Sequence, residues 1–194
     1  MYEVLVRIKE ADGTIISPAD FIAKAESLDL IQQIDKRVIA AELHHSKKLA
    51  DTGLPTILTI TVSSRSVGME AISIGTELSV NPFDIIFEIT ETATQRSGGH
   101  ATTFVNHLSD AGYRVAIDDF GSGTTSVRQI QTLPFHMLKL DESLVLTLAK
   151  DAHYQEFAKA TCGLAHAIGL DVIAEFVQDE ETLKFLGEIG VKYA

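Results

Sequence analysis

Short apolar runs that end in acidic residues constrain the fold of this chain more than any other feature. Such runs lie around Phe87, Val115 and Val172, and Lys139 lies within a fourth. β-Branched and aliphatic residues grouped between helical stretches indicate buried strands. Neighbouring strands with charged ends would gather the carboxylates in one pocket, and burying that charge is costly without cations. The pattern therefore predicts a site for Mg²⁺, Mn²⁺ or Ca²⁺, which prefer oxygen ligands.

Strand-like and helix-like segments alternate along the chain. Strands are expected at Tyr2–Ile8, Thr56–Val62, Ile85–Thr90, Arg114–Asp118, Met137–Leu140 and Asp171–Ala174, with the start of another at Val191–Ala194. Helices are expected after the N-cap Ser17 and at Ile31–Ala50, Met69–Leu78, His100–Ala111, Ser126–Thr132, His153–Ile168 and Glu180–Ile189. This alternation predicts a parallel sheet in an α/β fold, best matched by a (β/α)₈ barrel. An open doubly wound sheet is the alternative.

A single domain is expected over residues 1–194, because no linker, repeat or low-complexity segment divides the chain. A hydrophobic content of 45% suffices for one sizeable core. No apolar stretch approaches the roughly 20 residues of a membrane-spanning helix. Cys162 is the only cysteine, which excludes a disulfide framework and favours the cytoplasm. The net charge of −11 argues against a nucleic-acid polymer as partner and still allows a small phosphorylated ligand.

Adjacent carboxylates at Asp118 and Asp119, followed by Phe120-Gly121-Ser122-Gly123, form the strongest single motif. The strand is expected to end after Asp118, where the two glycines permit a turn. Both carboxylates could then face one site, and one of them could bridge two metals roughly 3.5–4 Å apart. An Asp-initiated turn with helix capping is the competing interpretation.

Other charged residues each admit two interpretations. Lys139 lies in an apolar strand, where it could orient an attacking water or form a structural ion pair. Glu88 and Glu91 share a site only if the chain turns near Thr90, because they are three residues apart. Arg7 could clamp a phosphate or form a surface salt bridge. The seven histidines lack zinc-ligand spacing and are interpreted as surface or core residues.

Five motifs, in order along the whole chain, resemble those of the EAL domain of bacterial cyclic di-GMP phosphodiesterases. They are Glu3-Val4-Leu5-Val6-Arg7, Glu88-Ile89-Thr90-Glu91, Asp118-Asp119-Phe120-Gly121-Ser122-Gly123, Lys139-Leu140-Asp141 and Ala174-Glu175-Phe176-Val177-Gln178. The resemblance implies a TIM-barrel-like (β/α)₈ fold whose first strand is antiparallel. It also implies a two-metal hydrolase that cleaves cyclic di-GMP to linear pGpG, with Mg²⁺ or Mn²⁺ as cofactor and Ca²⁺ as an inhibitor.

The same resemblance assigns the metal site to carboxylates. It implies that Glu3 and Glu88 are metal ligands, that Asp118 bridges the two metals and that Asp119 holds the second. Glu175 would support the second metal and its waters.

Catalysis and ligand binding involve further residues in this resemblance. Lys139 would act on the attacking water, with Glu175 as a second catalytic residue, and Glu91 would support the loop that follows the paired aspartates. That loop links the site to dimerisation in the family, so a homodimer is expected. Leu5 and Arg7 would contact cyclic di-GMP.

The chain departs from the family pattern at several positions. Thr61 stands where the family has an asparagine metal ligand, and a hydroxyl is a shorter and weaker ligand than an amide carbonyl. Gln178 replaces a glutamate and removes a negative charge. Thr124-Thr125 replaces the usual aromatic or aliphatic residue, whereas Val4 conserves apolar packing. The family's first strand and its C-terminal end are also expected to be missing.

These departures favour a degenerate EAL domain that recognises cyclic di-GMP as a signalling receptor, with impaired or lost phosphodiesterase activity. An active phosphodiesterase that forms pGpG is the alternative, because the core of carboxylates and Lys139 is retained. A protein-interaction module without nucleotide binding is a third hypothesis, supported by the two missing terminal segments. The sequence leaves open whether the domain is an enzyme.

Overall fold

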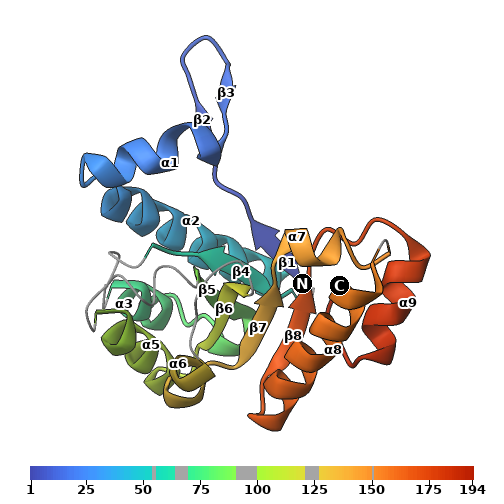
Figure 1. The fold of residues 1–194 in the computed structure, drawn as a ribbon. Coiled ribbons are helices and arrows are strands. Elements are labelled where there is room, and N and C mark those ends of the chain that lie inside the picture. The colour runs from blue at the N-terminus through green and yellow to red at the C-terminus, as the bar shows by residue number, and fades with distance from the viewer. Residues whose placement is uncertain (54–55, 64–69, 91–99, 121–126, 150) are drawn as a thin grey trace.

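The computed structural model describes residues 1–53, 56–63, 70–90, 100–120, 127–149 and 151–194. Its centre is a curved sheet of six parallel strands, ordered β1 (Tyr2–Val4), β4 (Leu58–Thr61), β5 (Ile85–Thr90), β6 (Arg114–Phe120), β7 (Met137–Leu140) and β8 (Asp171–Ala174) (Figure 1). The strands follow one another in space as they do in sequence, which is the arrangement of a (β/α)₈ barrel wall. The predicted TIM-barrel-like α/β fold is confirmed as a parallel half-barrel.

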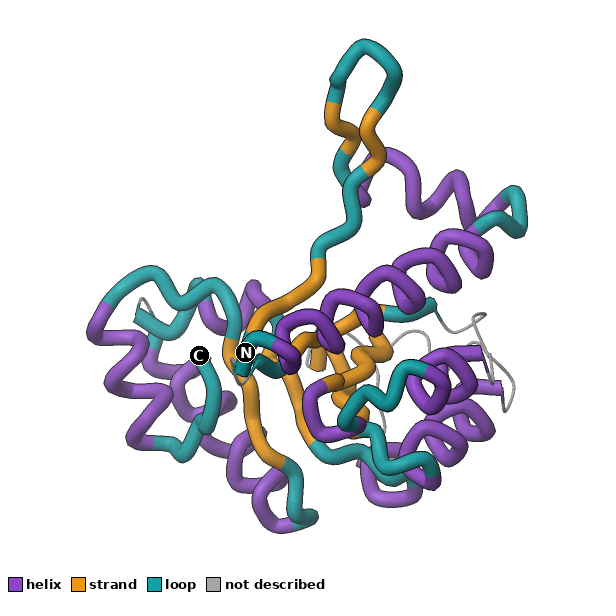
Figure 2. The backbone as a smooth tube through the Cα atoms, turned by 180° about the vertical axis from the view of Figure 1, so that it is seen from behind, coloured by secondary structure: helices purple, strands orange, loops and turns teal. Residues whose placement is uncertain are grey.

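Helices connect the strands, and most of them cover the outside of the sheet (Figure 2). They are α1 (Pro18–Ser27), α2 (Ile31–Asp51), α3 (Glu70–Glu77), the 3₁₀ helix η1 (Pro82–Asp84), α5 (His100–Asp110), α6 (Val127–Thr132), α7 (Glu142–Val145), α8 (Ala152–Ala167) and α9 (Glu180–Glu188). The sequence predicts all of the longer ones, but not η1 or α7. Among the described residues, no helix combines the length and the apolar character needed to cross a membrane.

Successive side chains of the strands alternate between two environments. Outward-facing residues such as Phe87, Val115 and Leu138 pack with the helices in one large core. Inward-facing residues form a separate apolar cluster, which contains Ile86, Ala116, Met137 and Ile173. Because strand side chains repeat with a period of two, the next inward positions lie two residues further on. Those positions are Glu88, Asp118, Lys139 and Glu175. A charged layer therefore rests on an apolar floor inside the half-barrel.

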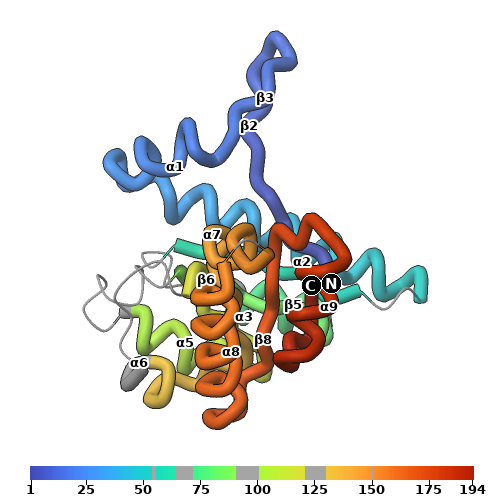
Figure 3. The backbone as a smooth tube through the Cα atoms, turned by 45° about the vertical axis from the view of Figure 1, so that its right-hand side comes forward, coloured from blue at the N-terminus to red at the C-terminus, as the bar shows by residue number. Residues whose placement is uncertain are grey.

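A hairpin of β2 (Ile8–Lys9) and β3 (Ile15–Ile16) projects from the sheet (Figure 3). The expected strand Tyr2–Ile8 is therefore wrong beyond Val4, because only Tyr2–Val4 pairs with β4. The chain instead enters a turn at Asp12-Gly13, where the backbone N–H of Thr14 donates to Asp12 Oδ1 at 2.8 Å and Gly13 has φ 94°.

Two smaller expectations also need correction. The strand expected at Val191–Ala194 is reduced to an isolated parallel bridge between Tyr193 and Ile173. Ser17 precedes α1 in an extended conformation, but its hydroxyl does not cap the helix. It donates a hydrogen bond to Asp20 Oδ2 in the first turn, at 2.8 Å.

Candidate active site

Four carboxylates and one lysine meet at the C-terminal ends of the strands, and we call this group the carboxylate cluster. Lys139 Nζ lies 2.7 Å from Glu88 Oε2, 2.9 Å from Glu175 Oε1, 3.2 Å from Asp118 Oδ1 and 3.7 Å from Glu3 Oε1. The five side chains come from β1, β5, β6, β7 and the residue after β8. Parallel register brings these distant residues together, since Glu88, Asp118, Lys139 and Glu175 each lie two positions after a residue of the apolar floor.

The cluster holds more negative charge than its lysine neutralises. Burial would lower the pKa of Lys139, but Glu88, Asp118 and Glu175 together hold that pKa above its ordinary value, so Lys139 is an ammonium. Burial raises the pKa of Glu88 to about 7, because the attraction of Lys139 offsets the desolvation only in part. Burial also raises the pKa of Glu3. A further cation would relieve this imbalance.

Asp118 and Asp119 lie in an irregular part of β6. The register with β7 shifts between Ile117 and Phe120, and Asp119 has φ 57°. The prediction that the strand ends after Asp118 is wrong, because β6 continues to Phe120 and Asp119 itself supplies the turn. The backbone N–H of Asp119 donates to Asp118 Oδ1 at 2.9 Å. Burial, followed by repulsion from Asp118, raises the pKa of Asp119 to about 6.

Thr61 contacts the cluster through Glu88. Its hydroxyl donates to Glu88 Oε2 at 3.2 Å, the same oxygen that accepts from Lys139. Within the described part of the chain, the other oxygen, Glu88 Oε1, is buried without a hydrogen-bond partner, as is the hydroxyl of Thr59. One oxygen of Glu88 is therefore fully engaged, whereas the other can take a further partner.

A cavity of about 430 Å³ adjoins the cluster between β1, β4, α1 and α2. Its lining is mostly aliphatic, including Leu5, Ile22 and Ile34, and Thr61 and Asp35 are among its polar residues. Asp35 Oδ2 accepts from the backbone N–H of Ser63 at 2.9 Å, which ties α2 to the segment after β4. An apolar cavity with a few polar groups is typical of small-molecule sites.

A second cavity, of about 620 Å³, borders the cluster between β1 and the segment after β8. Glu3, Thr59, Glu88 and Glu175 line it, together with Phe176. The carboxylate cluster thus adjoins both cavities, because Glu88 lines the second and accepts a hydrogen bond from Thr61, which lines the first.

Several predicted residues stand apart from the cluster. Arg7 is exposed between β1 and β2, where its Nη1 donates to the carbonyl of Val6 at 2.8 Å, so it does not end a strand. Gln178 is exposed between β8 and α9. Cys162 is buried in α8. Glu91, Gly121, Gly123 and Thr124-Thr125 lie outside the described residues.

Sequence reasoning assigned no role to Asp35, Thr59 or Phe176. A signal for Asp35 was present, because a carboxylate interrupts the apolar face Ile31, Ile39, Leu43 of α2. Thr59 precedes Thr61 by two and therefore shares its face of β4. Nothing in the sequence marks the backbone conformation of Phe176.

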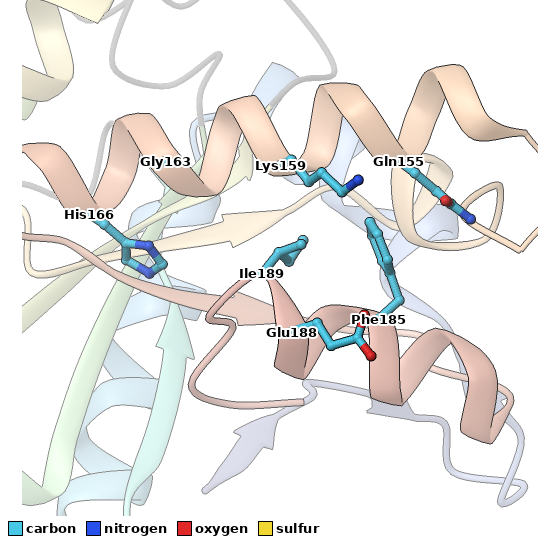
Figure 4. A pocket seen from close by; sticks show the side chains of 7 residues that line it. All are labelled: Gln155, Lys159, Gly163, His166, Phe185, Glu188 and Ile189. Carbon is cyan, nitrogen blue, oxygen red and sulfur yellow. The ribbon is translucent and has the colours of Figure 1, made fainter.

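A groove between α8 and α9 is separate from the carboxylate cluster (Figure 4). Its lining contains Lys159, His166, Phe185 and Glu188 but no member of the carboxylate cluster. Lys159 lies 5.7 Å from the centre of the Phe185 ring and pairs with Glu156 at 2.7 Å.

The donor set of the cluster fits a divalent metal chemically. Glu3, Glu88 and Asp118 of the cluster, together with the adjacent Asp119, would offer carboxylate oxygens, and Glu88 Oε1 is buried without another partner among the described residues. In the described ranges, however, no three acidic, histidine or cysteine side chains are arranged to hold an ion as they stand. The carboxylates converge on Lys139 Nζ instead. Metal binding would therefore require these side chains to turn from the ammonium toward the ion.

Three comparisons with known proteins agree with this geometry. The EAL domain family model matches residues 1–194. Cyclic di-GMP phosphodiesterase PdeB from Shewanella oneidensis is 33% identical over 197 residues, covering 99% of this chain and 23% of PdeB. The solved structure of the PaMucR phosphodiesterase in complex with c-di-GMP matches 97% of this chain and 79% of that one, with a TM-score of 0.89 and 26% identity. The FimX EAL domain from Pseudomonas aeruginosa bound to c-di-GMP shares the fold over 97% of this chain and 78% of that one, with a TM-score of 0.88 and 23% identity.

Fold and site together define a TIM-barrel-like α/β domain with an acidic site at its strand ends. The chain belongs to the EAL domain family. It spans 23% of the length of PdeB, so the activity of that whole protein does not transfer to it directly.

Proposed function

We propose that this domain recognises cyclic di-GMP as a signalling receptor and hydrolyses it weakly or not at all. Family membership and the c-di-GMP complex of the PaMucR relative support recognition of this nucleotide. The single observation behind impaired hydrolysis is the hydrogen bond from Thr61 Oγ1 to Glu88 Oε2, at the position where the EAL pattern has an asparagine. A hydroxyl that donates to Glu88 replaces a carbonyl that would bind metal beside it.

The phosphates of the nucleotide would lie over the carboxylate cluster. Glu3, Glu88, Asp118 and Asp119 would hold divalent ions, which when bound would offset the negative charge and activate a water. The first cavity would take an apolar base face, because Leu5 lines it next to Thr61. Arg7, exposed just beyond Leu5, would contact a phosphate.

An active phosphodiesterase that forms pGpG is the second candidate. The observation in its favour is the 2.9 Å contact between Lys139 Nζ and Glu175 Oε1 within one cluster of carboxylates. Lys139, held as an ammonium, would orient an attacking water, and Glu175 would keep that lysine in place. In this case a water would fill the place of the missing amide.

Calorimetry with cyclic di-GMP in Ca²⁺, followed by product analysis in Mg²⁺ and in Mn²⁺, separates the two candidates. The receptor proposal expects saturable binding with little or no pGpG. Rapid pGpG formation would support the active phosphodiesterase in its place, and absence of binding in Ca²⁺ together with absence of pGpG in Mg²⁺ and Mn²⁺ would refute both. Asp118→Asn is the matched control, since it should weaken binding in Ca²⁺ by removing a metal ligand.

A further inference from the structure

Phe176 has a backbone conformation that no local element explains. The described residues include four non-glycine positions with positive φ: Asp29, Ser79, Asp119 and Phe176. Asp29 and Ser79 are the second residues after the ends of α1 and α3, where a left-handed residue commonly terminates a helix. Phe176, with φ 56°, follows a strand and ends no helix. A bulky side chain in this region is an outlier, and such strain tends to persist at functional sites.

The side chain of Phe176 is also too exposed for core packing to explain why an aromatic residue stands at this position. It is 54% exposed, whereas the neighbouring strand residues Ile173 and Ala174 are each 2% exposed. Core packing therefore offsets little of its conformational cost. The strain and the exposure together suggest that the ring is held for a ligand.

The position of Phe176 is next to the reacting groups. It follows Glu175, whose Oε1 lies 2.9 Å from Lys139 Nζ, and it lines the 620 Å³ cavity with Glu3 and Glu88. Cyclic di-GMP carries two guanine bases on opposite sides of its phosphates. The carboxylate cluster likewise has two cavities beside it, of which Leu5 lines one and Phe176 the other.

We propose that Phe176 is a base-stacking residue whose ring packs against one guanine of cyclic di-GMP when the phosphates lie over the carboxylate cluster. This inference rests on the proposed recognition of that nucleotide. Aromatic side chains stack on nucleobases because every base presents a π-face. Phe176 would thus position the ligand and favour a purine, and it takes no part in proton transfer.

Backbone strain at position 176 favours glycine, whereas stacking on a base requires the aromatic ring. A substitution to glycine therefore separates the two effects. Glycine adopts positive φ without steric cost, so Phe176→Gly should leave the melting temperature unchanged or raise it. The same change removes the stacking surface. Affinity for cyclic di-GMP in Ca²⁺, measured by calorimetry, should fall by roughly 5- to 150-fold, as expected for loss of one base stack.

Two further variants complete the experiment. Phe176→Leu keeps an apolar side chain and the strained backbone but removes the ring, so its affinity should also fall. Ser79→Gly is the matched control, because Ser79 has φ 53° after α3. It should match Phe176→Gly in melting temperature while its affinity stays unchanged.

Unchanged affinity in Phe176→Gly, with a wild-type domain that binds, would overturn the stacking role and leave the proposed function standing. A joint fall of melting temperature and affinity in Phe176→Gly would instead assign Phe176 a structural role. Full affinity in Phe176→Leu would reject stacking in favour of apolar contact. Failure of the wild-type domain to bind cyclic di-GMP would refute the proposed function itself, and this inference with it.

Discussion

Lys139 Nζ and Glu88 Oε2 lie 2.7 Å apart inside the half-barrel, although 51 residues separate them in the chain. Both side chains are 1% exposed. The pair lies in the charged layer of the barrel interior, with Asp118 and Glu175 also within hydrogen-bonding reach of the ammonium. Lys139 therefore acts as the internal counter-charge of the site.

Lys139→Met should destabilise the domain in the absence of divalent ions. Methionine keeps the length and apolar stem of lysine but leaves Glu88 buried without a counter-charge. Breaking a buried ion pair in this way typically costs about 3–5 kcal/mol. Urea denaturation in a chelator measures the change. Lys159→Met is the control, because Lys159 pairs with exposed Glu156 and should matter little. Equal losses in both variants would contradict the central role of Lys139.

Gly75→Ala should destabilise the domain through a clash with Tyr113. A Cβ at Gly75 would overlap Tyr113 Oη and lie 3.2 Å from Cζ of the same ring. Overpacking of this kind typically costs about 1–3 kcal/mol. Tyr113→Phe removes the overlapping oxygen and should restore part of the loss, which a double-mutant cycle in urea would reveal.

A glycine-to-alanine substitution at Gly163 is the control for the clash between position 75 and Tyr113. Gly163 lies within α8, where an added Cβ meets no atom within 4 Å. Gly163→Ala should therefore stabilise the domain by about 0.5–1 kcal/mol through helix propensity. If both alanines destabilised the domain equally, contact with Tyr113 would not be the cause.

Cys162 should resist alkylation in the folded domain and contribute a pH-dependent stability. Burial raises the pKa of its thiol from 9.0 to about 11. Between these values the unfolded chain releases the thiol proton while the folded chain retains it, so the free energy of unfolding should fall as pH rises above about 9. Urea titrations at several alkaline pH values measure this slope.

Cys162→Ala should make that alkaline slope shallower, because it removes the titrating group. Iodoacetamide should label the wild-type thiol at pH 8 only as fast as the domain unfolds. Rapid labelling under native conditions would show that the thiol is accessible, against the structure.

Thr61→Asn with Gln178→Glu should raise the hydrolysis of cyclic di-GMP well above that of the starting chain. Asparagine restores a carbonyl oxygen beside Glu88, and glutamate restores the negative charge that Gln178 lacks. Product analysis in Mg²⁺ should show the double variant exceeding the sum of the single ones, if both residues tune one water.

Thr61→Val is the matched control for that gain of activity. It removes the hydroxyl that donates to Glu88 without adding a ligand, so hydrolysis should not rise. Normal nucleotide binding by the Thr61→Asn, Gln178→Glu variant without pGpG formation would place the defect elsewhere in the domain.

Most of the secondary structure follows from local patterns in the sequence. Ile85–Thr90, Met137–Leu140 and Asp171–Ala174 are strands with the predicted bounds, because each is an apolar run between helical segments. Period-two alternation within these runs also places their charged residues on one face. The parallel order of the strands then brings Glu88 and Lys139 to one rim.

Only the tertiary structure determined how the charges pair and where the backbone turns. The donation from Thr61 to Glu88 depends on the register between β4 and β5, which no local pattern specifies. The left-handed conformation of Phe176 contradicts residue preference, and that of Asp119 falls inside a strand, so their surroundings must impose both. The end of β1 at Val4 likewise reflects the extent of its pairing with β4. Residue type and spacing thus determined the strands and the charged side chains that they carry. Contacts between distant segments decided which carboxylate oxygen accepts each hydrogen bond, where the backbone turns and which cavity each side chain lines.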